Sequence, residues 1–138
     1  MSKIFIYSLL LSACFHKVET GSVDEYMDDT LSLAYIMAGE CLQCDSLEKA
    51  ATGSTVLNRV LHSKFPTTIQ EVIKQTNQYK GYCTEWYVYD KQCYEIARQL
   101  LSGAERDTNI IYFHSIRDKK PPYVKKILYR HKYHEFGI

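Results

Sequence analysis

The sequence predicts a single α+β domain, mostly helical, with a small antiparallel sheet or hairpin near the C-terminus. Amphipathic runs at helical spacing fill the chain before Gly103, whereas β-branched and aromatic residues dominate after Asn109. With 138 residues, the chain is long enough to bury its own core. The formal net charge of +1 provides no global field that selects nucleic acid, so no nucleic-acid partner is expected.

The first residues have the features of an export signal. Lys3 precedes an uncharged apolar run over residues 4–13, which is too short for a membrane-spanning helix of about 20 residues. The order Leu11-Ser12-Ala13-Cys14 resembles the bacterial lipoprotein box, in which Cys14 would be lipidated. Simple signal cleavage, or retention as an apolar arm, are the alternatives. We therefore predict an export segment over 1–14, a linker over 15–30 and the folded domain over 31–138.

Two neighbouring amphipathic runs predict the first pair of helices. Thr30 is a candidate N-cap, apolar residues follow over 33–37, and Gly39 is a natural terminator. The second helix, over 46–59, begins at a capping Asp45 or Ser46. Its apolar stripe consists of Leu47, Ala50, Ala51, Ser54, Leu57 and Leu61. The small residues Ala50, Ala51, Gly53 and Ser54 would let this helix lie close to the first.

The remaining elements follow in the order helix, loop, helix, strand. A short helix is predicted over 68–75 and an amphipathic helix over 90–101, with a polar and aromatic loop between them at 77–86. Residues 109–113 predict a buried strand, and the segment 124–135 alternates loosely and could pair with it. Helices followed by a small sheet are the basis of the α+β prediction.

The five cysteines are compatible with export. If Cys14 carries lipid, Cys41, Cys44, Cys83 and Cys93 remain, an even number that predicts two disulfides with three possible pairings. Bridges from the Cys41/Cys44 pair to Cys83 and Cys93 would pin the end of the first helix to a distant loop. Free buried thiols rank second. A four-cysteine zinc site ranks third, because nine residues rather than two separate the second pair. No metal and no cofactor are expected.

Glu40 stands where the first predicted helix stops. The partial negative charge at a helix C-terminus and apolar neighbours such as Met37 favour a protonated carboxyl, which is the form that a general acid requires. A solvated glutamate at a helix end is the alternative interpretation. The spacing places no partner carboxylate; the candidates are Asp45, Glu48, Glu71 and Glu85.

A set of short motifs, taken in order, resembles the SleB/CwlJ-type cell wall hydrolases. They are Leu33-Ala34, Ala38-Gly39-Glu40, Val56-Leu57-Asn58-Arg59-Val60, Phe65-Pro66, Thr68-Ile69, Val72, Gln78-Tyr79, Tyr112-Phe113, and His134 with Phe136. The similarity covers about 31–136. It implies a lysozyme-like fold related to lytic transglycosylases, with Glu40 as the acid. Many relatives carry a second Glu where this chain has Cys44.

The resemblance implies cleavage of the peptidoglycan glycan strand between muramic acid and glucosamine, by a lytic transglycosylase or a muramidase-type glycosidase. Without a placed second carboxylate, transglycosylation is favoured, because the muramyl 6-hydroxyl can attack and one Glu can serve as acid and base. Asn58 and Arg59 are interpreted as structural, and the pair His131 and His134 lacks a third metal ligand by spacing. The predicted sugar contacts are Gln78, Tyr79, Tyr82, Tyr112 and His134.

The expected partner is peptidoglycan, with membrane attachment if Cys14 is lipidated, and the chain is expected to be a monomer. The expected location is the periplasm or cell envelope, or the virion if a phage encodes the chain. Two alternatives remain at this point: a non-catalytic wall-binding or virion component that kept the fold, and a cysteine-rich zinc module.

Overall fold

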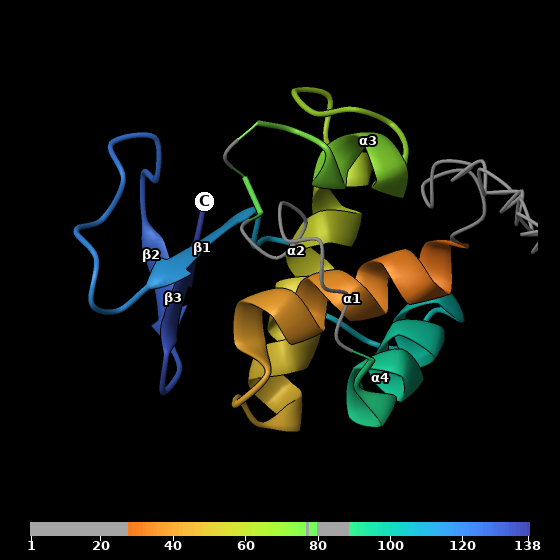
Figure 1. The fold of residues 1–138 in the computed structure, drawn as a ribbon. Coiled ribbons are helices and arrows are strands. Elements are labelled where there is room, and N and C mark those ends of the chain that lie inside the picture. The colour runs from red at the N-terminus through yellow and green to blue at the C-terminus, as the bar shows by residue number, and fades with distance from the viewer. Residues whose placement is uncertain (1–27, 77, 80–88) are drawn as a thin grey trace, which may run out of the picture.

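A computed structural model of the chain describes residues 28–76, 78, 79 and 89–138. Four helices precede a three-stranded antiparallel sheet, which confirms the predicted α+β class. Figure 1 shows the helices grouped together and the sheet standing beside them. The predicted export segment with Cys14, and most of the predicted linker, lie outside the described residues. In the part of the chain that is described, no helix is long and apolar enough to cross a membrane.

Each helix begins at a side chain that accepts a hydrogen bond from a backbone N–H of the first turn. The prediction of Thr30 as the first N-cap is wrong, because Asp28 accepts from the Leu31 N–H at 2.8 Å and starts the helix earlier. Gly39 is not a terminator either, because the helix continues to Cys41. The helices are α1 (Asp29–Cys41), α2 (Ser46–Val60), α3 (Ile69–Ile73) and α4 (Lys91–Leu101).

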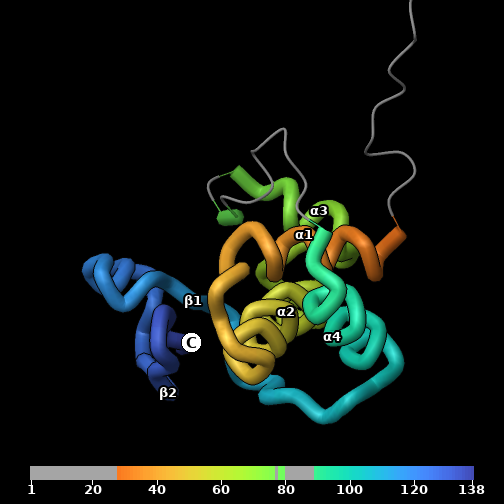
Figure 2. The backbone as a smooth tube through the Cα atoms, turned by 60° about the horizontal axis from the view of Figure 1, so that its bottom comes forward, coloured from red at the N-terminus to blue at the C-terminus, as the bar shows by residue number. Residues whose placement is uncertain are grey.

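Helix α2 is the central helix, and α1, α3 and α4 lie around it in both views (Figures 1 and 2). Gly53 permits the close approach: a Cβ there would stand 2.7 Å from Met37 Sδ on α1 and 3.0 Å from Leu100 Cδ1 on α4. The predicted close packing of α2 on α1 is therefore confirmed. The predicted apolar stripe is wrong at both ends, since Leu47 is 69% exposed and Leu61 is 76% exposed.

Buried polar side chains of α2 hold neighbouring segments in place. Lys49 is 3% exposed, and its Nζ donates to Gln92 Oε1 at 2.8 Å and lies 3.3 Å from Asp90 Oδ1 at the start of α4. Asn58 Nδ2 donates to the Ile110 carbonyl at 2.8 Å. Buried polar groups need such partners, so these contacts fix where α4 and the segment before the sheet can lie.

The sheet has the strand order β1-β3-β2, with the last strand in the middle. Its strands are β1 (Tyr112–Ser115), β2 (Ile127–Arg130) and β3 (His134–Gly137). The prediction of a strand over 109–113 that pairs with the segment 124–135 is only partly correct. The strand starts later because the carbonyls of Ile110 and Ile111 accept hydrogen bonds from side chains of α2. Moreover, β2 pairs with β3 and not with β1.

Two buried apolar clusters meet at one ring. The larger cluster lies among the helices, and the smaller one joins Ala51 of α2 to Ile110 and Phe136 near the sheet. Phe113 on β1 packs against both clusters. This ring therefore couples the position of the sheet to the helical core.

The N-cap of α4 predicts a pH-dependent stability. The Cys93 N–H, at 2.7 Å from Asp90 Oδ1, and then Lys49 hold the pKa of Asp90 below its ordinary value. The folded form therefore gains stability above a pH of about 4, where an unfolded Asp is ionised, and loses it as pH falls toward the lowered pKa. Asp90→Asn keeps a capping side chain but removes the charge. We expect it to cost about 1 kcal/mol at neutral pH.

Urea denaturation between pH 7 and pH 2 checks this prediction. The unfolding free energies of the wild type and Asp90→Asn should converge at the acid end, where both side chains are neutral. The exposed Glu105→Gln should follow the wild type throughout. A difference between Asp90→Asn and the wild type that stays constant with pH would contradict the role of the charge.

Candidate active site

Glu40 lies in the last turn of α1 and lines a cleft between that helix end and the sheet. The cleft has a volume of about 420 Å³, and the Glu40 side chain is partly exposed, so that a ligand can reach it. Strands β1 and β3 and the loop after β1 supply the opposite wall. The lining residues are Gly39, Glu40, Gln78, Phe113, His114, Ser115, Asp118, Pro121, Tyr123 and His134.

The fold brings two of the predicted sugar contacts to Glu40 and keeps a third away from solvent. Gln78 and His134 line the same cleft as Glu40, although they come from distant parts of the sequence. Tyr79 is 2% exposed and belongs to the helical core, so its predicted role as a stacking surface for sugar is wrong. Tyr82, a further predicted contact, lies outside the described residues.

Tyr79 instead stands beside the acid from within the core. Burial raises the pKa of Tyr79 to about 12, against the lowering effect of the Arg59 guanidinium, and the charge of Glu40 raises it further. The Tyr79 hydroxyl therefore stays protonated at neutral pH and lies near enough to Glu40 to respond to its charge. This residue supports the cleft rather than forming its surface.

Tyr112 lines a second, larger cavity of about 660 Å³. Its ring centroid lies 5.1 Å from that of Tyr123, which is 54% exposed and lines both this cavity and the cleft at Glu40. Tyr123 therefore lies between the cleft and the larger cavity. Sequence reasoning did not single it out, because it follows a stretch that reads as a charged loop and carries no motif.

Arg59, at the end of α2, contacts both residues that line the cleft and residues of the helical core. It is 3% exposed; its Nε donates to the Ile111 carbonyl at 2.7 Å, and one terminal nitrogen donates to Gln78 Oε1 at 3.1 Å. The guanidinium carbon lies over the rings of Tyr79 and Tyr112, at 5.2 and 5.4 Å from their centroids. These contacts agree with the interpretation of Arg59 as structural, and they position the amide that faces Glu40.

None of the described candidates for a second catalytic carboxylate lines the cleft at Glu40. Of the three described candidates, Asp45 caps α2, Glu48 is fully buried, and Glu71 bonds with Thr68 on the surface. The fourth, Glu85, lies outside the described residues. Among the residues that line the cleft, the second carboxylate is that of Asp118. It follows β1 in the loop, where no spacing rule pointed to it.

Among the described cysteines the structure has one disulfide, where the sequence predicted two with their pairing open. Cys41 and Cys44 form a disulfide with each other, and Cys93 is a free, buried thiol. Of the three pairings that the sequence left open, the two that bridge Cys41 and Cys44 to Cys83 and Cys93 are therefore excluded. A second disulfide at Cys93 is excluded as well, because this free thiol faces the helical core from α4. Cys83 lies outside the described residues.

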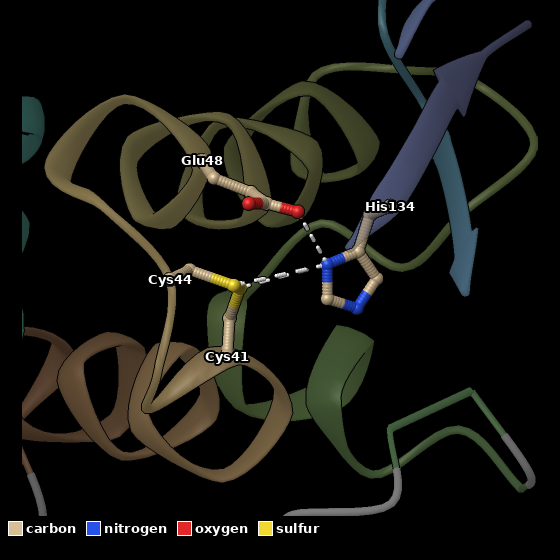
Figure 3. Close-up of side chains that lie close together, drawn as sticks. All are labelled: Cys41, Cys44, Glu48 and His134. Atoms are coloured by element: carbon tan, nitrogen blue, oxygen red, sulfur yellow. Dashed lines mark hydrogen bonds and ion pairs between the residues drawn. A yellow bond between two sulfur atoms is a disulfide. The ribbon is translucent and has the colours of Figure 1, made fainter. Parts of the chain in front are cut away.

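Beside this disulfide, Glu48 and His134 join α2 to β3 (Figure 3). Glu48 Oε1 accepts hydrogen bonds from His134 Nδ1 and from the Tyr133 N–H, each at 2.9 Å. The His134 ring contacts the ring of Phe113 edge-on, with a centroid distance of 5.5 Å. Glu48 and His134 thereby fix the start of β3, which forms one wall of the cleft.

A carboxyl group at the rim of an open cleft, facing an amide and aromatic rings, is typical of the sites of enzymes that cleave glycans. Residues 45–137 match the Cell Wall Hydrolase family model. The chain belongs to this family, as the motifs around Asn58 and Arg59 had indicated. No curated protein matches the chain significantly.

Two solved structures share the fold. The catalytic domain of the SleB protein of Bacillus cereus superposes with a TM-score of 0.72 at 18% identity, over 80% of this chain and 89% of that chain. The catalytic domain of the germination-specific lytic transglycosylase SleB of Bacillus anthracis gives a TM-score of 0.67 at 17% identity, over 82% of this chain and 97% of that chain. At these identities the likeness establishes the fold.

The contacts of Arg59 predict that lysine cannot replace it. Arg59→Lys keeps a positive charge but loses the planar group that donates to the Ile111 carbonyl and to Gln78 while it stacks on two rings. We expect a loss of about 2 kcal/mol in the free energy of unfolding. Chemical denaturation measures it, with Arg98→Lys as the matched control, since Arg98 is 60% exposed. Equal stability of the two variants would contradict the structural role.

Proposed function

We propose that this cell wall hydrolase cleaves the glycan strands of peptidoglycan between muramic acid and glucosamine, with Glu40 as acid and base. The observation that carries the proposal is the position of Glu40 on the wall of an open cleft, opposite His134 and Gln78. Family membership supports a cell-wall substrate. The Bacillus anthracis protein that shares the fold is a lytic transglycosylase, and this supports the reaction type.

The assignment of Glu40 rests on its geometry and its spacing, since the family match begins at residue 45. Of the two acids that line the cleft, Glu40 stands on a helix and Asp118 on a loop. Rigid elements hold reacting groups more accurately than loops. Glu40 also lies between two buried residues of α1, Ala38 and Cys41, each 3% exposed, so packing fixes the backbone on both sides of it. This supports Glu40 as the group that transfers the proton.

The proposed reaction needs one carboxyl group. Glu40 gives its proton to the glycosidic oxygen as the bond from that oxygen to muramyl C1 breaks. The muramyl 6-hydroxyl then attacks C1 and returns its proton to the Glu40 carboxylate. A 1,6-anhydro ring forms, one glycosidic bond is lost, and the enzyme regains its starting state. Hydrolysis would instead require a second carboxylate that acts as general base on a water molecule, and Asp118 is the candidate that lines the cleft.

The walls beyond Glu40 offer contacts that suit a sugar chain. The exposed ring of Tyr123 presents an apolar face and a hydroxyl where the cleft meets the larger cavity. Gln78, held by Arg59, offers an amide for sugar hydroxyls. We propose that the glycan strand runs from Glu40 past Tyr123 toward Tyr112.

The substrate lies outside the cytoplasm, and this agrees with the predicted export. Cleavage of the segment 1–14 and lipid attachment at Cys14 remain predictions. They concern residues outside the described part of the chain.

Replacement of Glu40 tests the chemistry. We expect Glu40→Gln to lower the turnover of purified sacculi at least about 1,000-fold, because the amide keeps the shape but cannot give or take the proton. Turbidity loss and released muropeptides measure turnover, and co-sedimentation measures binding, which should persist. Glu95→Gln, the same change on the exposed side of α4, should leave turnover intact. A wild type that binds sacculi without turnover would instead support a non-catalytic wall-binding protein.

Removal of the Tyr123 ring tests the path of the glycan. We expect Tyr123→Ala to raise KM about fivefold with little change in kcat, because a stacking contact of about 1 kcal/mol acts on bound substrate and transition state alike. Steady-state kinetics on soluble glycan strands measure both constants. Tyr89→Ala, which removes a ring of similar exposure (59%) beside α4, is the control and should have no effect. Equal KM values for the two variants would contradict a glycan path along Tyr123.

A further inference from the structure

Four buried side chains converge where the end of α1, the start of α2 and the start of β3 meet (Figure 3). Cys41, Cys44, Glu48 and His134 are 3%, 7%, 0% and 8% exposed. One potential ligand atom of each lies within 4.8 Å of those of the other three. Two cysteine sulfurs, an imidazole and a carboxylate share one small volume, and once the disulfide is reduced they form a set of zinc ligands.

We propose that Cys41, Cys44, Glu48 and His134 bind one zinc ion when the two cysteines are reduced. Glu48 supplies an independent indication of a missing partner. Its Oε1 is occupied by His134 and the Tyr133 N–H, but its fully buried Oε2 has no hydrogen-bond partner among the described residues. A buried carboxylate oxygen without a partner is costly, and a cation satisfies it.

The sulfur–nitrogen distances agree with tetrahedral coordination, whereas the two sulfurs, bonded to each other in the disulfide, have to separate to about 3.8 Å after reduction. Cys41 Sγ and Cys44 Sγ lie 3.5 and 4.0 Å from His134 Nδ1. In a tetrahedral site with Zn–S bonds of about 2.3 Å and Zn–N bonds of about 2.0–2.1 Å, the sulfur and nitrogen ligands stand about 3.5 Å apart. Glu48 Oε1 lies 2.9 Å from the same nitrogen, at hydrogen-bond distance. Zinc at Nδ1 would replace that hydrogen bond, so that Glu48 could turn Oε2 to the metal and keep Oε1 on the Tyr133 N–H.

The disulfide is the oxidised form of the same pair. A dithiol reductant exchanges with it and is oxidised to its own disulfide, which leaves thiols on Cys41 and Cys44. Zinc binding then releases the two thiol protons, and the His134 proton moves from Nδ1 to Nε2 so that Nδ1 can bind the metal. Each cysteine sulfur gains one electron and one proton when the disulfide is reduced, and the dithiol reductant loses two of each, so the exchange is balanced.

Zinc suits this ligand set better than other common ions. Two thiolates and an imidazole are too soft for calcium or magnesium, which take oxygen ligands. Four protein ligands leave no open position, as in structural zinc sites. The site differs from the four-cysteine zinc module considered from the sequence, because Glu48 and His134 replace Cys83 and Cys93. Its bonds would hold the end of α1, where Glu40 precedes Cys41, against β3.

Zinc analysis of the reduced full-length chain tests the proposal. The chain is purified with a phosphine reductant and dialysed against zinc, and zinc is measured by atomic emission. We expect one zinc per wild-type chain, and a fall in affinity of more than about 100-fold for Cys44→Ser and for Glu48→Gln. Cys93→Ala and the double variant Cys14→Ser/Cys83→Ser are the controls and should keep full occupancy.

Two further readouts separate lost metal binding from lost folding. Zinc should protect Cys41 and Cys44 from alkylation, with the modified peptides identified by mass spectrometry, and chelation should expose them in a chain that keeps its circular dichroism. Cobalt in place of zinc should show thiolate-to-metal charge-transfer bands that Cys44→Ser weakens. A reduced, folded wild type that binds no zinc overturns the proposal, as does zinc that is retained by Cys44→Ser but lost from Cys14→Ser/Cys83→Ser. Preferential binding of copper(I) would also overturn the choice of zinc.

Discussion

A helix that is buried over most of its length has to satisfy its polar side chains inside the protein, and this constraint on α2 organises the domain. Lys49 of α2 bonds to the start of α4, Asn58 and Arg59 bond to the backbone before β1, and Glu48 bonds to the start of β3. A buried donor or acceptor left unpaired costs about 1–3 kcal/mol. The polar side chains of α2 therefore decide where the sheet stands relative to the helices, and so where the wall opposite Glu40 lies.

The cleft follows from that arrangement. Glu40 comes from α1, Gln78 is held by Arg59 of α2, and His134 is held by Glu48 of α2, so two of the groups that face Glu40 are positioned by the central helix. The second carboxylate of the site, Asp118, lies on a loop, which holds a reacting group less accurately than a helix does. The proposed reaction needs only Glu40 and is therefore compatible with this site. The bridge between Cys41 and Cys44, or the zinc that we propose in its place, would hold the same helix end.

Much of the fold and part of the site could be predicted from the sequence, namely the features that neighbouring residues determine. The helices follow from caps and apolar spacing, and the family follows from the ordered set of motifs that includes Val56-Leu57-Asn58-Arg59-Val60. The outward position of Leu47 and the burial of Lys49 could not be predicted, because they depend on partners that α4 supplies from far along the chain. The pairing of the cysteines depends on distances that only the fold defines. Asp118 and Tyr123 carry no local pattern at all.

Product analysis tests the central claim most directly. Sacculi are digested with the full-length chain, and the released muropeptides are analysed by mass spectrometry. Glycan cleavage through one carboxyl group and the muramyl 6-hydroxyl predicts fragments that end in 1,6-anhydro-muramic acid. Fragments that end in reducing muramic acid would contradict the single-acid reaction and direct attention to Asp118. The absence of any new glycan end would contradict glycan cleavage itself.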